Sequence, residues 1–264
     1  MTEPEKLDSA AQKFYHAIRV LEEFDCKELR GVVKGMFSLT DREKCYVATY
    51  YRAALNVHSL VFLNDPKHFQ AIAQLARALF ELAVDMRLLG VVDKAAEKMF
   101  AFSDWERLKS AREIGSLRGS SDETTLAERF IRDREAAIMQ RKKELWPDVD
   151  RFTHWSGMDL PTRVRQLSAP FDELYKEHYR RHSWYVHAGL AGVLNFEADA
   201  FPAIAGMALQ VAAECYVDVL KAVIAEIQLS KIVDDIYKRL DFAQKLAFTG
   251  SPEEANALRR AMLE

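Results

Sequence analysis

Apolar residues recur at helical spacing along almost the whole chain, and no segment bounded by turn residues shows the alternation of a strand. The pattern predicts an all-α fold, a single-domain bundle spanning residues 1–264 with about nine or ten helices. The helices are expected near residues 6–35, 41–63, 66–90, 93–117, 122–146, 161–168, 170–195, 200–228, 229–248 and 252–263. Those near 72–89 and 171–196 should pack against each other at the centre.

Capping signals mark where several of these helices begin. Thr40-Asp41-Arg42-Glu43 has the spacing of a capping box, in which the first and last side chains satisfy each other's backbone amides. Asp65-Pro66 and Ser251-Pro252 each place a capping side chain before a proline at the first helical position. The one long connection, residues 147–160, is aromatic, and we expect it to cover a cleft.

The composition is that of a soluble globular protein, with 49% hydrophobic and 29% charged residues. The net charge of -3 argues against a chain that coats nucleic acid but leaves room for a local basic cleft. The N-terminus has no apolar core of a secretory signal, and charges interrupt the most apolar stretch, residues 203–227. We therefore expect a cytoplasmic protein without a membrane span.

Three widely spaced cysteines, Cys26, Cys45 and Cys215, form no Cys-x-x-Cys pair. A disulfide framework and a cysteine zinc site are both disfavoured, which fits a reducing compartment. We expect no cofactor and no metal.

The helix near residues 72–89 is apolar almost all round, yet Arg77, Glu81 and Asp85 line up within it at i, i+4 and i+8. One interpretation is an ion pair within the helix at a partly wet edge. The other is that Arg77 or Glu81 reaches across to a second segment and orients it.

That second segment is residues 175–187, which concentrate three histidines, two adjacent arginines and several aromatic residues. On a helix, Arg180, Ser183 and His187 share one stripe, whereas Tyr179 and His182 belong to a stripe that looks like packing surface. The first stripe offers a cation, a hydroxyl and a titratable base. This set suits metal-independent RNA cleavage, in which histidine moves a proton and arginine holds the phosphate.

Arg181-His182-Ser183-Trp184-Tyr185-Val186-His187 resembles the Arg-to-His signature of HEPN-type ribonuclease domains, with His182 at the polar position after the arginine. The resemblance implies an all-α fold, an RNA substrate, a homodimer that joins two Arg/His pairs, and a defence or toxin role. It makes Arg181 and His187 the catalytic pair, with Arg180 as a second candidate on helical geometry. The supporting residues would be Ser183, Tyr179, Glu81, Arg77 and His182.

A second resemblance covers more of the chain. His154-Trp155-Ser156-Gly157, the later Tyr175, Tyr179 and Ser183-x-x-Val186-His187, and the earlier Arg77-x-x-x-Glu81 are similar to a bacterial domain-of-unknown-function family, DUF5677. The likeness spans roughly residues 50–195, with helices at 200–263 completing the bundle. It implies a fold and an arrangement of residues, but no activity.

Other interpretations compete with this one. Arg52 and His58 show the same Arg-to-His spacing, and their structural interpretation is a core histidine with a surface arginine. His178 and His182 stand at i, i+4, as two metal-binding imidazoles would. Ser183 lacks the Gly-x-Ser-x-Gly elbow of an acylating serine.

Two further alternatives remain open. The charged segment 123–146 is read as a solvated helix face, with a nucleic-acid stripe of Arg129, Arg132 and Arg134 as the alternative. The alternative to a nuclease is a non-catalytic helical protein that binds a ligand or a partner. In that protein His187 would be a buried structural residue.

Overall fold

The computed structural model describes residues 3–116, 122–149, 153–167, 171–179 and 200–249, and within them it contains helices and no strand. The predicted all-α fold is therefore confirmed. The long helices are α1 (Glu3–Phe24), α3 (Asp41–Phe62), α4 (Phe69–Val91), α5 (Ala95–Gly115), α6 (Asp122–Leu145), α10 (Phe201–Glu226) and α11 (Ile236–Ala247). The shorter helices are α2 (Arg30–Lys34), α7 (Leu160–Arg165) and α8 (Phe171–Leu174).

The chain divides into two compact units. The first unit comprises residues 1–87 and 167–264, and the second unit comprises residues 88–166. The expectation that both fold as a single domain stays a prediction, which a single cooperative unfolding transition would support.

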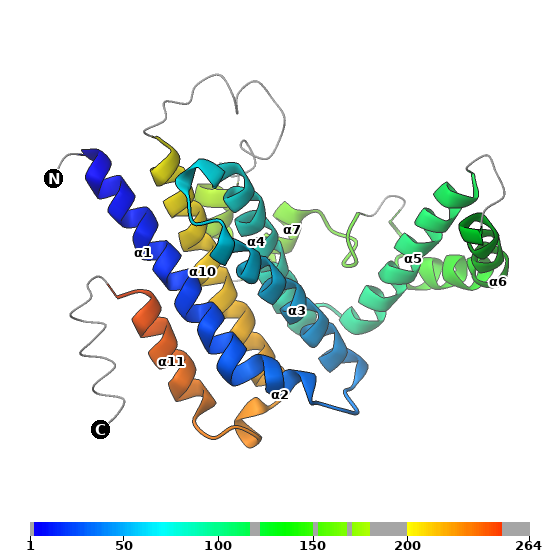
Figure 1. Cartoon of the computed structure of the whole chain (residues 1–264). Helices are drawn as coiled ribbons and strands as arrows, with labels where there is room; N and C mark the ends of the chain where they lie inside the picture. Colours follow the sequence, from blue (N-terminus) through cyan, green and yellow to red (C-terminus); the bar gives the residue numbers. More distant parts are fainter. Residues whose placement is uncertain (1–2, 117–121, 150–152, 168–170, 180–199, 250–264) are drawn as a thin grey trace. The chain divides into compact units, whose positions relative to one another are not determined.

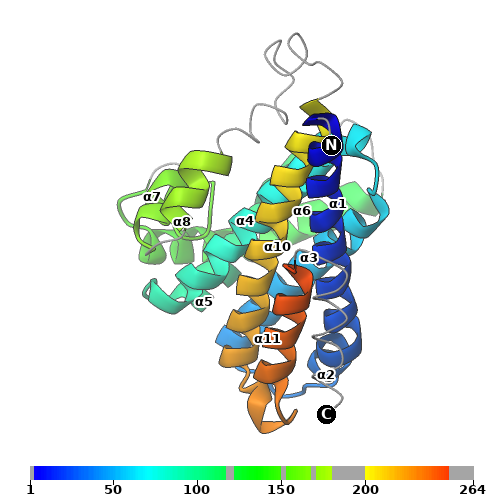
Figure 2. The same cartoon turned by 90° about the vertical axis from the view of Figure 1, so that its left-hand side faces the viewer.

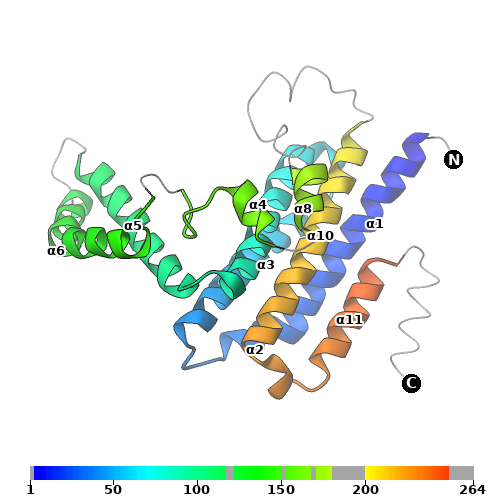
Figure 3. The same cartoon turned by 180° about the vertical axis from the view of Figure 1, so that it is seen from behind.

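In the first unit, α1, α10 and α11 run side by side, and α3 packs against α1 and α10 (Figures 1, 2 and 3). α10 is the central helix, because its own side chains are mostly apolar and most of them are buried. Two ion pairs join it to its neighbours: Arg42 of α3 to Glu226, with Nη2 3.0 Å from Oε2, and Arg87 of α4 to Asp218, with Nη2 2.8 Å from Oδ1.

Among the described helices, α10 is also long and apolar enough to cross a membrane by length and composition. Of its most apolar stretch, however, 72% is buried inside the fold, which is the pattern of a core helix.

The predicted capping signals for α3 and α4 are confirmed. The amide of Thr40 donates to Oε2 of Glu43 at 2.7 Å, and the amide of Glu43 donates to Oγ1 of Thr40 at 3.3 Å. Before α4, the side chain of Asp65 accepts from the amide of Lys67 at 2.8 Å, at the start of the 3-10 turn Pro66–His68. The cap predicted at Ser251-Pro252 and the last predicted helix lie outside the described residues.

Several predicted helices differ from the structure. The one predicted over residues 66–90 begins with a 3-10 turn, and the one predicted over residues 170–195 includes the π-helical turn Tyr175–Tyr179. The segment predicted as one helix over residues 6–35 contains a π-helical turn, Asp25–Leu29, between α1 and α2. The segment predicted over residues 229–248 is broken, because only the 3-10 turn Leu229–Lys231 precedes α11 and Asp235 adopts a left-handed conformation with φ 57°. Aspartate tolerates that conformation better than most residues, and it interrupts the helical hydrogen bonds.

In the second unit, α5 and α6 pack against each other along most of their lengths. The end of α6 and the residue after it, Leu145 and Trp146, are buried against Phe102 and Trp105 of α5 and against Val149. This contact anchors the loop that leads to α7.

Candidate functional site

The candidate site in the first unit begins with two charged side chains on the largely apolar helix α4. α4 buries most of its length, and Arg77 and Glu81 lie one turn apart on its less buried edge. The two form an ion pair, with Nε of Arg77 3.2 Å from Oε1 of Glu81, and their side chains are 25% and 37% exposed. An isolated pair at that exposure contributes little to stability. Its interest lies in what else the two groups bind.

Both groups bind the hydroxyl of Tyr179. Nε of Arg77 donates to this hydroxyl at 2.7 Å, and the hydroxyl donates to Oε1 of Glu81, also at 2.7 Å. The guanidinium carbon of Arg77 lies 4.9 Å from the centre of the Tyr179 ring, within the range of a cation–π contact. The three side chains therefore form a closed hydrogen-bonded triad, hereafter the Arg77–Glu81–Tyr179 triad.

Aromatic packing holds Tyr179 in this position. It ends the π-helical turn Tyr175–Tyr179, and its ring stacks on that of Tyr175 with centroids 5.4 Å apart. Phe80 of α4 contacts both Tyr179, at 5.2 Å, and Phe171 of α8, at 6.1 Å between ring centroids. The described beginning of the segment predicted over residues 171–196 thus contacts α4 as expected, and π-turns recur at functional positions.

The electrostatics of the triad make Tyr179 a hydrogen-bonding bridge rather than a proton-transfer group. Burial raises the pKa of its hydroxyl, and the hydrogen bond to Glu81 and the charge of Glu81 raise it further. Tyr179 therefore remains a neutral donor across the physiological pH range. Its role is to tie the start of the second segment to α4.

The structure brings together three of the predicted supporting residues: Arg77, Glu81 and Tyr179. The ion pair within the helix is confirmed, and both of its members also contact Tyr179 at the start of the second segment. That they orient the rest of this segment stays a prediction. The remaining site residues predicted from the sequence lie outside the described residues: Arg180, Arg181, His182, Ser183 and His187.

The second Arg-to-His match belongs to a different environment. His58 was assigned a core position in its structural interpretation, but this is wrong, because its side chain is 49% exposed. Its Nδ1 lies 3.1 Å from Oε1 of Glu22 on α1, whereas Arg52 is exposed on the surface as expected. The position faces outward because the buried stripe of α3 runs through Ala53, Val57 and Leu60 instead.

Sequence reasoning missed a buried polar cluster in the first unit. Asp25, in the π-turn after α1, is fully buried. Its carboxylate accepts from the hydroxyl of Tyr50 on α3 and from Nε of Arg30 on α2, the latter at 3.0 Å. Burial, followed by the charge of Asp25, raises the pKa of both Tyr50 and Tyr216 of α10. The cluster joins three helices, and Asp25 extends the buried face of α1 at helical spacing from Ile18 and Leu21.

The aromatic loop of the second unit packs against the end of α6. Nε1 of Trp146 donates to the carbonyl of Trp155 at 3.0 Å, and the side chains of His154 and Ser156 share a hydrogen bond of 2.8 Å. Gly157 has φ 75°, and an added β-carbon would lie 2.9 Å from Cδ1 of Trp146. The glycine is therefore required both by its backbone and by the close approach of the indole.

The described residues contain no cluster of three or more histidine, cysteine, aspartate or glutamate side chains suited to a metal ion. The three cysteines are free thiols, and only Cys26 is exposed. The competing interpretation of His178 and His182 as a metal-binding pair falls outside the described side chains.

Comparison with known proteins identifies a family. The model of a family described as a family of unknown function, DUF5677, matches residues 45–199, which is more than half of the chain. The match includes the Arg77–Glu81–Tyr179 triad and confirms the second resemblance found in the sequence. No curated protein and no solved structure matches the chain. The resemblance to HEPN domains stays a prediction.

Proposed function

The chain belongs to the DUF5677 family of unknown function, and from that premise we propose that it is a HEPN-like, metal-independent endoribonuclease. The observation that carries the proposal is the double hydrogen bond of Tyr179 to Arg77 and Glu81, each 2.7 Å long. Tyr179 directly precedes Arg180 in the sequence. Fixing its side chain fixes the backbone from which the Arg/His segment continues.

In this proposal His187 is the general acid–base residue. An unperturbed histidine has a pKa of about 6.5, so both protonation states are populated near neutral pH. Neutral His187 takes the proton of a ribose 2′-hydroxyl, whose oxygen attacks the adjacent phosphorus while the bond to the 5′ oxygen breaks. In a homodimer the second copy of His187, protonated, returns a proton to that 5′ oxygen. The products are a 2′,3′-cyclic phosphate and a 5′-hydroxyl.

Arg181 or Arg180 holds the phosphate as negative charge builds on its oxygens. A guanidinium suits this task because it donates two parallel hydrogen bonds to a phosphate and stays charged. Ser183 and His182 lie next to this pair in the sequence and would support it. The Arg77–Glu81–Tyr179 triad acts as a positioning group, since none of its members needs to touch the RNA.

The proposal also includes a homodimer, an RNA partner and a cytoplasmic location. The dimer follows from the resemblance to HEPN domains, in which two Arg/His pairs share one cleft. The location rests on the free thiols, two of which are buried in the first unit. In the cell, such a nuclease would act as a defence-associated toxin.

A substrate comparison tests the proposal. The purified chain is incubated in EDTA with a labelled RNA oligonucleotide and with the DNA of the same sequence. We expect cleavage of the RNA alone, with cyclic-phosphate ends detectable by mass spectrometry, because DNA lacks the 2′-hydroxyl nucleophile. Cleavage of both strands, or RNA cleavage that stops in EDTA, would contradict the proposed chemistry.

A further inference from the structure

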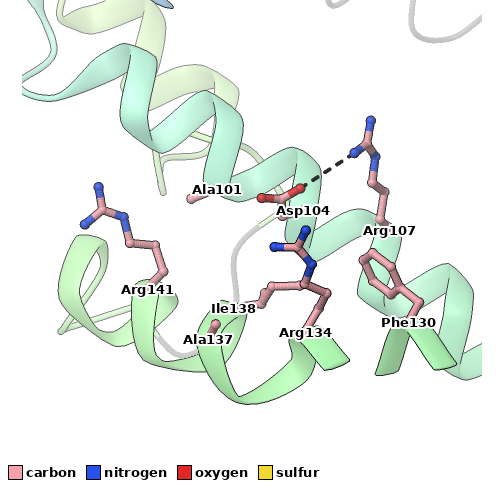
Figure 4. Close-up of a pocket in the computed structure, with 8 residues that line it drawn as sticks. All are labelled: Ala101, Asp104, Arg107, Phe130, Arg134, Ala137, Ile138 and Arg141. Carbon is pink, nitrogen blue, oxygen red and sulfur yellow. Dashed lines mark ion pairs between the residues drawn. The ribbon is translucent and has the colours of Figure 1, made fainter. Parts of the chain in front are cut away.

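The second unit contains a groove between α5 and α6 that lies within that unit alone. Its hollow has a volume of about 440 Å³, which is in the range of small-ligand sites. Figure 4 shows side chains from both helices lining it. The lining includes Asp104 and Arg107 of α5 and Phe130, Arg134, Ile138 and Arg141 of α6.

The charge of this groove is positive, with three arginines against one aspartate. Arg107 is only loosely paired, with Nη1 3.8 Å from Oδ1 of Asp104. Arg141 pairs with Glu97 and with Glu144, neither of which lines the hollow. These contacts leave the groove with an excess of guanidinium groups.

Arg134 is the key cation. Its side chain extends from α6 toward α5 in Figure 4, and within the described part of the chain it has no ion-pair partner. The two other arginines of the predicted nucleic-acid stripe differ from it. Arg129 and Arg132 do not line the groove, and both lie within 4 Å of Asp133. Of that stripe, only Arg134 is available to an anion in the groove.

The groove also offers an apolar surface for a planar ring. Phe130 and Ile138 line it beside the arginines. Phe130 and Arg107 also line an adjoining hollow of about 770 Å³, whose other polar lining residues are Ser103, Ser110 and Glu106. The two hollows thus share an aromatic ring and a cation, as expected for a track along which phosphates and bases alternate.

We propose that this groove binds nucleotide phosphates, carried either by a single-stranded RNA or by a free nucleotide. Arg134 and Arg107 bind the phosphate oxygens, and Phe130 stacks against the base. The site goes beyond the proposed nuclease function. It is formed entirely by described residues of the second unit, and its test is binding rather than cleavage.

Fluorescence anisotropy on the full-length chain tests this site. One probe is a labelled, mixed-sequence 2′-O-methyl RNA of about 12 nucleotides, a length typical of single-strand sites. It cannot be cleaved through a 2′-hydroxyl, so the result does not depend on nuclease activity. The second probe is labelled AMP. Binding of the RNA alone identifies a strand as the ligand, and binding of both identifies the nucleotide unit as sufficient.

Arg134→Glu and Arg132→Glu form a matched pair, because both reverse one exposed charge on α6 and only the first changes the groove. We expect Arg134→Glu to weaken binding at least about tenfold. It should also reduce the slope of log affinity against log salt concentration by about 1, which corresponds to the loss of one phosphate contact. Arg132→Glu should change affinity less than about threefold. Phe130→Leu should weaken binding about fivefold or more through lost stacking. Equal affinities for the two charge reversals, or no binding of either probe, would overturn the proposal.

Discussion

The hydroxyl of Tyr179 donates a hydrogen bond of 2.7 Å to Oε1 of Glu81, although 98 residues separate the two in the sequence. The same hydroxyl accepts from Arg77, so its donor and acceptor functions are both used. This contact fixes the residue that directly precedes the predicted Arg/His segment to the half-buried edge of α4.

Replacing Tyr179 with phenylalanine tests the strength of that contact. Tyr179→Phe should lower the free energy of unfolding by about 1–3 kcal/mol, because Arg77 and Glu81 lose a partly buried partner. Urea denaturation measures the difference. Tyr175→Phe is the matched control, since Tyr175 stacks on Tyr179 but its hydroxyl has no hydrogen bond among the described residues. Its effect should stay within about 0.5 kcal/mol, and equal losses in the two variants would refute a specific role for the triad.

Asp25 should be among the least replaceable residues of the first unit. Asp25→Ala leaves Arg30 without its buried carboxylate and the Tyr50 hydroxyl without its acceptor. We expect a loss of about 3–5 kcal/mol in the free energy of unfolding. Asp241→Ala, which breaks an exposed pair with Lys245, should cost less than about 1 kcal/mol. A similar, small loss for both variants would show that the buried cluster is not a structural anchor.

Gly157 should resist substitution because of the indole beside it. Gly157→Ala combines a left-handed backbone with a β-carbon 2.9 Å from Trp146, and we expect a loss of about 1–3 kcal/mol in thermal or urea unfolding. Gly31→Ala is the opposite case, because nothing lies within 4 Å of its added carbon and Gly31 is inside α2. It should stabilise the chain by about 0.5–1 kcal/mol. Destabilisation by both substitutions to the same extent would contradict this account.

The contribution of Glu22 to stability should depend on pH. Burial alone raises its pKa, but hydrogen bonds with Cys26 and His58 outweigh burial, so that the pKa is lowered from 4.5. Its stabilising contribution is therefore complete above pH 4.5 and is lost as the pH falls through the lower pKa of the folded state. The difference in unfolding free energy between wild type and Glu22→Gln should shrink over that interval. A difference that grows on acidification would reverse the assigned sign.

The sequence predicted the helices and part of the candidate site for identifiable reasons. Apolar spacing and the caps at Thr40 and Asp65 act locally, so the predicted bounds of α3 are within one residue and those of α4 within three. The i, i+4 spacing of Arg77 and Glu81 is local as well. Their contact with Tyr179 could not be predicted from the sequence. Glu81 and Tyr179 are 98 positions apart, so their contact depends on how the helices pack rather than on local spacing.

The buried Asp25 cluster was not predictable in the same way. Asp25 lies at regular helical spacing from the buried Ile18 and Leu21. Its partners Tyr50 and Arg30 come from other helices, so their contacts with it depend on packing rather than on local spacing. The groove in the second unit was hidden for a different reason. α6 alternates in charge, and only the packing against α5 separates Arg134 from the paired arginines on the same helix.

The most direct test of the proposed nuclease compares single-turnover RNA cleavage in EDTA by wild type, His187→Ala and His58→Ala. Both histidines follow an arginine at the same spacing, but His58 lies at the surface beside Glu22. We predict that His187→Ala lowers the rate by about 100-fold or more, the usual effect of losing a general acid–base residue. His58→Ala should cleave at the wild-type rate. Equal rates for wild type and His187→Ala, or no cleavage by either, would contradict the account.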